Sequence, residues 1–376
     1  MKIGKFKLHH YINYMVIGLL TLVLGIMALS GMRFDNSLLF LLEKVAISMI
    51  LAVSLSLVVG ILGELSLGHA GFMCVGAYLG GKVASLLVPV LGNGLLALVI
   101  SLIVGCAAAA LCGVIIGIPA LRLRGDYLAI VTLAFGEIVK SLFQNSSDAS
   151  FGGALGLETP RYDKNYLFII AFVLVLLTLA VVQNLIRSKH GRAITAIRDN
   201  EIAARASGIN VTKYKLLAFI LSAAFAGVAG VLYSYSNYTV QSTKFGYNYS
   251  IEILVMVVLG GMGSINGSII AATLITYLNT KLATVLTGDL AVLQNLLYAL
   301  ILIGIVIYNN APALKGFRDK YNPGALMDKL KKHDPAHIKD DKAKWDVVPT
   351  KISMDEILSV DLTPQDFGTK EKGGDN

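Results

Sequence analysis

Long apolar runs separated by short polar segments dominate the chain. They recur from Tyr11 to Asn309, and each is close to the length of about 20 residues that a helix needs to cross roughly 30 Å of hydrocarbon. Helices satisfy their own backbone polar groups inside a bilayer, so the pattern predicts an all-α, polytopic helical membrane protein. About ten spans are expected, at residues 11–31, 38–62, 67–88, 94–118, 127–145, 166–186, 216–236, 250–262, 265–287 and 290–309.

Two of these spans have a second interpretation. Lysines precede the first apolar run, which ends in Ala28-Leu29-Ser30 and so also resembles a signal peptide; its length favours a retained first helix. The eighth, 250–262, is too short to cross alone and adjoins a glycine cluster.

Basic residues gather in blocks between the apolar runs, and four of these blocks face the same side if there are ten crossings. They are the N-terminal lysines, Arg122 with Arg124, the segment 187–215 and the stretch that begins at Lys315. By the positive-inside rule that side is the cytoplasm, and both termini lie there. We expect a transmembrane domain at 1–310, with a cytoplasmic loop at 187–215, and a charged cytoplasmic tail at 311–376.

Composition agrees with a membrane protein, because 55% of residues are hydrophobic and only 15% are charged, whereas soluble domains carry about 25% charged residues. The net charge of +8 does not indicate nucleic acid, since the basic blocks lack interleaved aromatic residues. The cysteines lie inside apolar runs without metal-ligand spacing, so no metal site is predicted.

One stretch nearly matches a phosphate-binding loop. Gly76, Gly81 and Lys82 fit G-x-x-x-x-G-K, but Val83 stands where the motif requires Ser or Thr. The preceding residues belong to a membrane span instead of a soluble strand. We therefore expect no ATPase site and no cofactor in this chain.

Glycine clusters and buried polar residues suggest a path through the membrane. The clusters around 65–71 and 259–267 fit either broken helices that line a cavity or close helix packing. Glu137 lies near the middle of a span, and we expect it either to face the bundle interior or to be protonated within the packing. His69 is interpreted as a helix-break residue or as a ligand. The path candidates are Ser66, Gly68, His69, Gly71, Glu137, Gly260, Gly261 and Gly263.

The loop at 187–215 is long enough to have structure of its own. Asn200 is expected to cap a short helix with Glu201 in its first turn, and Gly208 to end it in the left-handed conformation. Spacings of three and four place Arg198, Glu201 and Arg205 on one face, where they pair with each other or with a partner. Ala203 and Ala204 make the helix smooth enough to enter a groove of another subunit.

Four segments resemble the permease subunits of bacterial ATP-binding cassette importers, of the second permease type and the branched-chain amino acid family. They are LSLGHAGFMCVGAY, RLRGDYLAIVTLAFGEI, the stretch from GRAITAIRDNEIAARASGI to KLLAFILSAAFAGVAGVLYS, and SIEILVMVVLGGMGSINGSIIAA. The resemblance covers about 38–310. Glu201 stands one residue earlier than the acid of the wider E-A-A-x-x-x-G importer pattern, whereas Ala203, Ala204 and Gly208 keep their spacing.

The resemblance implies a bacterial inner-membrane permease that carries leucine, isoleucine or valine. Its expected partners are two ATP-binding subunits, which bind the ATP, a second permease, an extracytoplasmic solute-binding protein and the lipid bilayer. Arg198, Asn200, Glu201, Ala203, Ala204, Arg205 and Gly208 would contact an ATP-binding subunit. The alternatives are a permease for urea or short amides, a self-sufficient transporter that uses Glu137 or His69 as an ion site, and an intramembrane enzyme, for which no catalytic group assembles.

Overall fold

The computed structural model describes residues 17, 18, 21, 35–92, 94–121, 123, 125–285, 299, 300, 303 and 304. All of them belong to one unit of the chain, which ends at Val306. The predicted spans 11–31 and 290–309 lie outside the described residues except at a few positions. The predicted tail at 311–376 lies wholly outside them.

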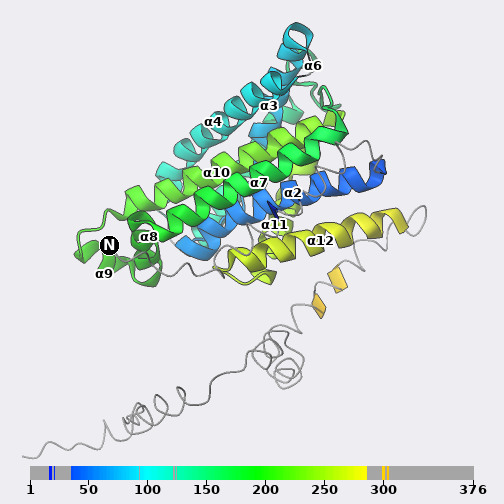
Figure 1. Cartoon of the computed structure of the whole chain (residues 1–376). Helices are drawn as coiled ribbons and strands as arrows, with labels where there is room; N and C mark the ends of the chain where they lie inside the picture. Colours follow the sequence, from blue (N-terminus) through cyan, green and yellow to red (C-terminus); the bar gives the residue numbers. More distant parts are fainter. Residues whose placement is uncertain are drawn as a thin grey trace, which may run out of the picture. The chain divides into compact units, whose positions relative to one another are not determined.

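The described part is a bundle of helices (Figure 1) with one small two-stranded sheet. Its elements are α2 (Asn36–Ser56), which continues as the π-helix η2 (Leu57–Leu62), then α3 (His69–Leu91), α4 (Leu95–Ala120), α5 (Asp126–Gln144), α6 (Asp148–Phe151), β1 (Leu157–Glu158), α7 (Lys164–Arg187), α8 (Lys189–Asp199), α9 (Glu201–Ala206), α10 (Val211–Ser236), β2 (Thr239–Val240), the 3-10 helix η3 (Ser242–Phe245), α11 (Tyr247–Leu259) and α12 (Ile265–Val285). The two strands pair antiparallel, with Leu157 opposite Val240.

Six helical segments of the described residues are long and apolar enough to cross a membrane. They are Asn36–Leu62, His69–Leu91, Leu95–Ala120, Tyr166–Arg187, Val211–Ser236 and Ile265–Val285. Each matches a predicted span to within a few residues. Helix α5 also matches one, at 127–145, but carries Asp126, Glu137 and Lys140 and is not among the six. Helix α11 has 13 residues, which confirms that this segment is too short to cross alone.

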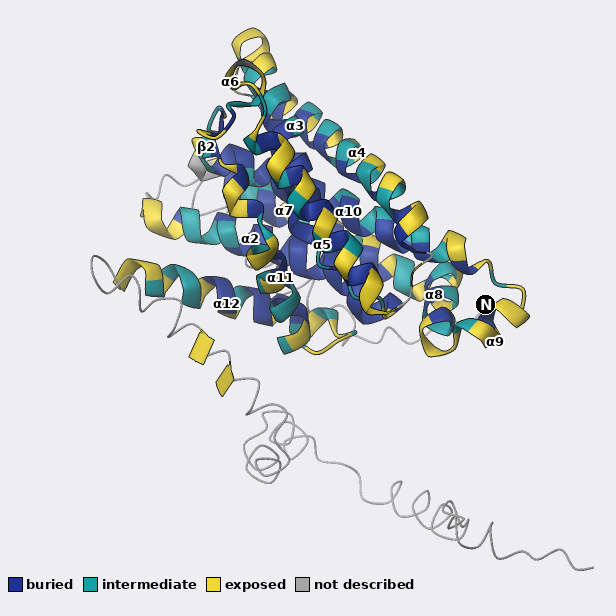
Figure 2. Cartoon of the chain, turned by 180° about the vertical axis from the view of Figure 1, so that it is seen from behind, coloured by how far each residue is buried: buried dark blue, intermediate teal, exposed yellow. Residues whose placement is uncertain are grey.

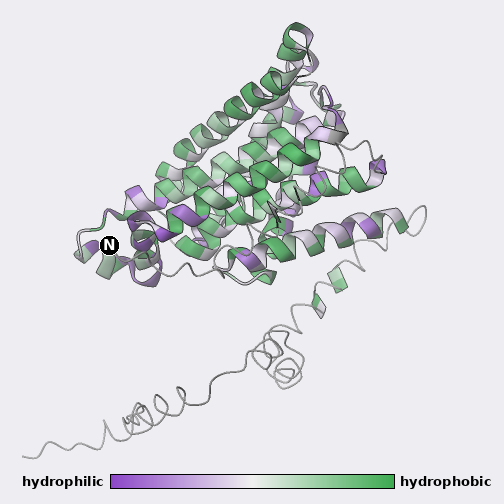
Figure 3. Ribbon diagram, in the orientation of Figure 1, coloured by the Kyte–Doolittle hydropathy of each residue, from purple (hydrophilic) through white to green (hydrophobic). Residues whose placement is uncertain are grey.

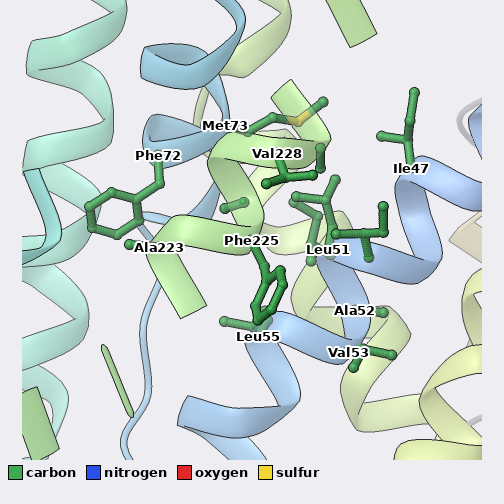
Figure 4. Packing of buried hydrophobic residues seen from close by; sticks show 14 of the residues in the cluster. Ile47, Leu51, Ala52, Val53, Leu55, Phe72, Met73, Ala223, Phe225 and Val228 are labelled. Atoms are coloured by element: carbon green, nitrogen blue, oxygen red, sulfur yellow. The ribbon is translucent and has the colours of Figure 1, made fainter. Parts of the chain in front are cut away.

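The core lies among α2, α3 and α10, where apolar side chains such as Leu51, Phe72 and Phe225 interlock (Figure 4). From Val45 to its end, helix α2 is buried, so this part is apolar on nearly every side. Helices α4, α5 and α12 instead turn large apolar side chains outward, including Ile103 and Ile138 (Figure 2). An apolar exterior of this kind is the surface that lipid or another membrane subunit covers.

Glycines allow the central helices to approach closely. A Cβ atom on Gly76 of α3 would collide with the backbone of Gly227 in α10, and one on Gly113 of α4 would lie 2.9 Å from the Cβ of Ala223. Small residues are the usual contact between membrane helices because they let backbones meet. Gly76, which the sequence places in a near-match to a phosphate-binding loop, thus serves close helix packing.

The segment between η2 and α3 is irregular over 63–68, and Gly63 has a φ of 81°. The predicted break therefore exists, but it ends before His69, and Gly71 lies inside α3. The cluster at 259–267 forms the turn between α11 and α12 instead of a break within one helix. Both junctions lie at the end of the bundle that carries α8 and α9, which we call the α9 end.

Candidate coupling site and translocation path

Two short helices, α8 and α9, form the polar surface of the α9 end (Figure 3). Ser188 caps α8, since its hydroxyl accepts hydrogen bonds from the backbone nitrogens of His190 at 3.1 Å and Gly191 at 3.3 Å. Asn200 then leaves the helical conformation, with φ −158° and ψ 105°. Its Oδ1 atom accepts from the backbone nitrogen of Ala203 at 3.0 Å, so the predicted cap of α9 is confirmed.

Helix α9 ends as the sequence predicts, because Gly208 has a φ of 82° and Ile209 donates its N–H to the carbonyl of Ala204 at 3.1 Å. Ala204 is buried, whereas Ala203 is exposed and Ile202 is 76% exposed. The helix thus presents a smooth, partly apolar face away from its own chain.

Arg198 does not share a face with Glu201 and Arg205, so that prediction is wrong. The backbone turns at Asn200, which places Arg198 in α8 and the other two in α9. Arg205 pairs with Glu201 at 2.9 Å. Arg198 instead pairs with Asp199 at 3.0 Å and donates from Nη1 to the carbonyl oxygen of Gly60 at 3.3 Å, which ties α8 to the end of η2.

Lys215, at the start of α10, forms the most buried ionic contact of this region. Its side chain is 5% exposed, and Nζ lies 2.5 Å from Oε1 of Glu64 and 3.1 Å from Oε2 of Glu201. Glu64 belongs to the irregular segment 63–68, and Glu201 begins α9. One ammonium group therefore joins α9, α10 and the break between η2 and α3. The sequence alone did not single out Glu64 or Lys215, although charges beside apolar runs were a signal.

Buried hydrogen bonds hold the irregular segment in place. The backbone nitrogen of Leu67 donates to Oγ1 of Thr132 in α5 at 3.0 Å, and that of Ala70 donates to Oγ of Ser250 in α11 at 3.1 Å. Nε2 of His69 lies 2.8 Å from Oγ of Ser54 in α2. His69 and Ser66 are both buried. Segment 63–68 and the first turn of α3 are thus fixed to three helices.

Gly68 and Gly71 pack against α5. A Cβ on Gly68 would collide with the carbonyl oxygen of Thr132, and one on Gly71 would lie 2.7 Å from Cα of Gly136. Of the two interpretations of this cluster, close packing is the one that these contacts favour.

The turn between α11 and α12 contacts the end of η2. A Cβ on Gly60 would lie 2.5 Å from the backbone nitrogen of Gly263, and Gly260 packs against Gly267. Gly261 and Gly263 have φ values of 90° and 88°, so both need the left-handed region. Gly263 also lines a cavity of about 330 Å³ together with Ile61, Gln183, Ile186, Arg187, Ser264, Ile265 and Asn266.

Glu137 lies in neither of the two environments predicted for it, which were the bundle interior and a protonated position within the packing. Its side chain is 32% exposed and pairs with Lys140 one turn later at 3.0 Å. Its other oxygen accepts from the backbone nitrogen of Tyr247 at 2.8 Å, at the start of α11. A carboxylate is favourable at a helix N-terminus, so Glu137 anchors α11 to α5. Its partner is 110 residues away in the sequence, which sequence spacing does not reveal.

Comparison with known families decides what kind of protein this is. The family described as "Branched-chain amino acid transport system / permease component" matches residues 37–308. The chain belongs to this family. The match runs from the start of α2 past α12 and includes α8, α9 and both glycine-rich junctions.

Individual relatives agree with the family. The high-affinity branched-chain amino acid transport system permease protein LivM of Salmonella typhimurium is 40% identical over 261 residues, which are 61% of this chain and 60% of that protein. The LivM protein of Escherichia coli K12 is also 40% identical, over 260 residues and the same shares. The ribose import permease RbsC of E. coli K12 is 29% identical over 320 residues, 78% of this chain and 92% of RbsC. The chain thus spans about 60% of the LivM length. No solved structure matches it.

Proposed function

We propose that the chain is a membrane-spanning permease subunit of an ATP-driven importer and forms part of the translocation path for leucine, isoleucine or valine. The observation that carries this proposal is the family match over 37–308. The 40% identity to two LivM proteins favours branched-chain amino acids over ribose, for which the named relative is 29% identical.

The proposed topology has ten crossings with both termini in the cytoplasm of a bacterial inner membrane. It places the α9 end on the cytoplasmic side, because the basic segment 187–215 includes α8 and α9. The count includes α11 as the eighth segment, although it is too short to cross alone.

Helix α9 is the proposed contact with an ATP-binding subunit. Ile202, Ala203 and the surface around Gly208 are exposed, whereas Glu201 and Arg198 connect the helix pair inward to Lys215 and Gly60. Motion of the ATP-binding subunits on ATP binding would be transmitted through these contacts to segment 63–68 and to the turn at Gly263. It would open the translocation path alternately to the two sides of the membrane.

The remaining partners in this proposal are a second permease, a second ATP-binding subunit and an extracytoplasmic solute-binding protein. An ion-coupled transporter built on Glu137 or His69 has less support, because Glu137 is paired with Lys140 and caps α11, and His69 is engaged with Ser54.

The test is to purify the tagged chain in mild detergent, identify its companions by mass spectrometry, and reconstitute the complex in liposomes with its solute-binding protein. We expect stoichiometric ATP-binding and permease subunits, and ATP-dependent uptake of leucine that excess isoleucine or valine inhibits. Urea and ribose are the competing solutes. Uptake by the lone chain on an ion gradient, without ATP, would contradict the proposal.

A further inference from the structure

A cavity of about 610 Å³, with charged side chains in a largely apolar wall, lies at the other end of the bundle from α9. It is enclosed by the first half of α2, the end of α10, η3, the first turns of α11 and the second half of α12. Sites for small ligands usually measure about 300–1,000 Å³. The volume is therefore sufficient for one amino acid with some water.

Charges of both signs face this cavity. Its lining includes Lys44 of α2, Lys244 of η3, Glu252 of α11 and Asn279 of α12. Nδ2 of Asn279 donates to Oε1 of Glu252 at 3.0 Å, which fixes the carboxylate. Nζ of Lys44 lies 4.5 Å from the centre of the Phe40 ring, and Lys44 interacts electrostatically with both Glu252 and Lys244.

Part of the wall is apolar, and hydroxyl-bearing side chains such as Ser48 and Thr276 line other parts of it. Ile47, Phe245 and Met256 also line the cavity, and they are 3%, 1% and 2% exposed. Charged groups inside apolar spans are costly, and in membrane proteins they commonly mark the path of a polar solute. Lys44 lies in such a span, on α2, and Glu252 lies in the short apolar helix α11; both line the cavity.

Two ammonium groups, one carboxylate and an apolar wall complement an α-amino acid zwitterion with an aliphatic side chain. We propose that this cavity binds the transported amino acid, with its carboxylate held by Lys44 and Lys244, its ammonium group by Glu252, and its side chain against Ile47, Phe245 and Met256. Lys244 is exposed and stands at the mouth, where it attracts the carboxylate first. A neutral solute such as a sugar would bring no opposite charge to these groups when it displaces their water.

This inference rests on the proposed function and adds the residues that select the substrate. The cavity is separate from the predicted path residues Ser66, Gly68, His69 and Gly71. These residues lie at or just before the start of α3, near the α9 end. In the proposed topology it lies on the outer side, where a solute-binding protein would deliver its cargo.

The experiment measures equilibrium binding of radiolabelled leucine to the detergent-purified complex without its solute-binding protein. The competitors are 4-methylpentanoate, which lacks the ammonium group, and 3-methylbutylamine, which lacks the carboxylate. We expect leucine to bind the wild type and neither half-analogue to displace it when in excess. Lys244→Gln and Glu252→Gln should each raise the dissociation constant roughly tenfold or more, as loss of a charged hydrogen-bond partner does.

The matched control is Lys281→Gln, a lysine on α12 that does not line the cavity and contacts the Tyr277 ring at 5.9 Å. It should bind leucine as the wild type does. If Glu252→Gln fails to assemble, Lys244→Gln, on the short segment η3, still tests the site.

The two proposals fail in different ways. Wild-type leucine affinity in both cavity variants, in a complex that takes up leucine with ATP, overturns the cavity assignment and leaves the permease function standing. A wild-type complex that moves no branched-chain amino acid overturns both. Displacement of leucine by 3-methylbutylamine as effectively as by unlabelled leucine also overturns the assignment of the two lysines.

Discussion

At the level of single residues, Lys215 shows how a buried charge can connect distant parts of this chain. Its ammonium group satisfies Glu64, 151 residues earlier, and Glu201, 14 residues earlier. Removing one member of a group of buried ion pairs leaves a charge without its counter-ion. The resulting loss of folding free energy exceeds what the intact ion pairs contribute to stability. Exposed pairs such as Arg205 with Glu201 gain little by comparison.

We therefore expect Lys215→Met to lower the free energy of unfolding by about 3 kcal/mol, because Glu64 and Glu201 would lose their shared cation. Arg205→Gln, the control, removes a 64%-exposed partner and should cost less than about 1 kcal/mol. Thermal unfolding of the detergent-purified chain measures both. Adding Glu64→Gln to Lys215→Met should recover part of the loss. Equal melting temperatures for Lys215→Met and Arg205→Gln would refute the ionic role of Lys215.

At the level of elements, α9 is a six-residue helix whose two ends are fixed by local chemistry. The Asn200 cap and the left-handed Gly208 follow directly from residue type, and both were predictable from the sequence. At Gly208 no described atom lies within 4 Å of the place that a Cβ would occupy. The surface around Gly208 is thus open in the isolated chain, as a contact for a partner would be.

We expect Gly208→Trp to abolish ATP-driven leucine uptake and to reduce recovery of ATP-binding subunits, because the added side chain would occupy the proposed contact. Gly92→Trp is the control, since Gly92 also has a positive φ, of 74°, and open space around its Cβ position. A side chain at Gly208 costs about 1–2 kcal/mol of backbone strain. Gly92 has a ψ of 168° and so lies in a region that side chains adopt even less readily, which means that backbone strain alone would harm the control at least as much. Loss of uptake in both variants to the same extent would assign the effect to backbone strain and remove α9 as the contact.

The sequence predicts elements better than it predicts their partners. Spans such as 38–62 and 94–118 were located within a few residues because a long apolar run has one stable arrangement in lipid. The grouping of Arg198 with Glu201 was wrong because the predicted cap at Asn200 also ends the preceding helix. The setting of Glu137 depends on Tyr247 in another helix, and only the folded chain brings these two together.

At the scale of the whole molecule, the described residues divide into two functional ends joined by enclosed helices. The α9 end holds the buried ion pairs of Lys215 and the proposed contact for an ATP-binding partner, and the opposite end holds the charged cavity. Helix α2 and its continuation η2 extend between the two ends, since Lys44 of α2 lines the cavity and Gly60 of η2 accepts from Arg198. A shift of α8 would therefore act on the same helix that carries part of the proposed substrate site.

The family match ends at residue 308 and the unit that holds all described residues ends at Val306, so the transport machinery should not require the sequence that follows. We expect truncation after Asn310 to leave ATP-dependent leucine uptake within about twofold of the full chain, a change of less than about 0.5 kcal/mol in the apparent activation free energy. Uptake by the reconstituted complex, normalised to the amount of assembled permease, is the measurement. Truncation after Val285 is the comparison: it removes the predicted last span, 290–309, and should abolish uptake. Failure of the chain truncated after Asn310 to recover its ATP-binding subunits would instead assign residues 311–376 a part in assembly.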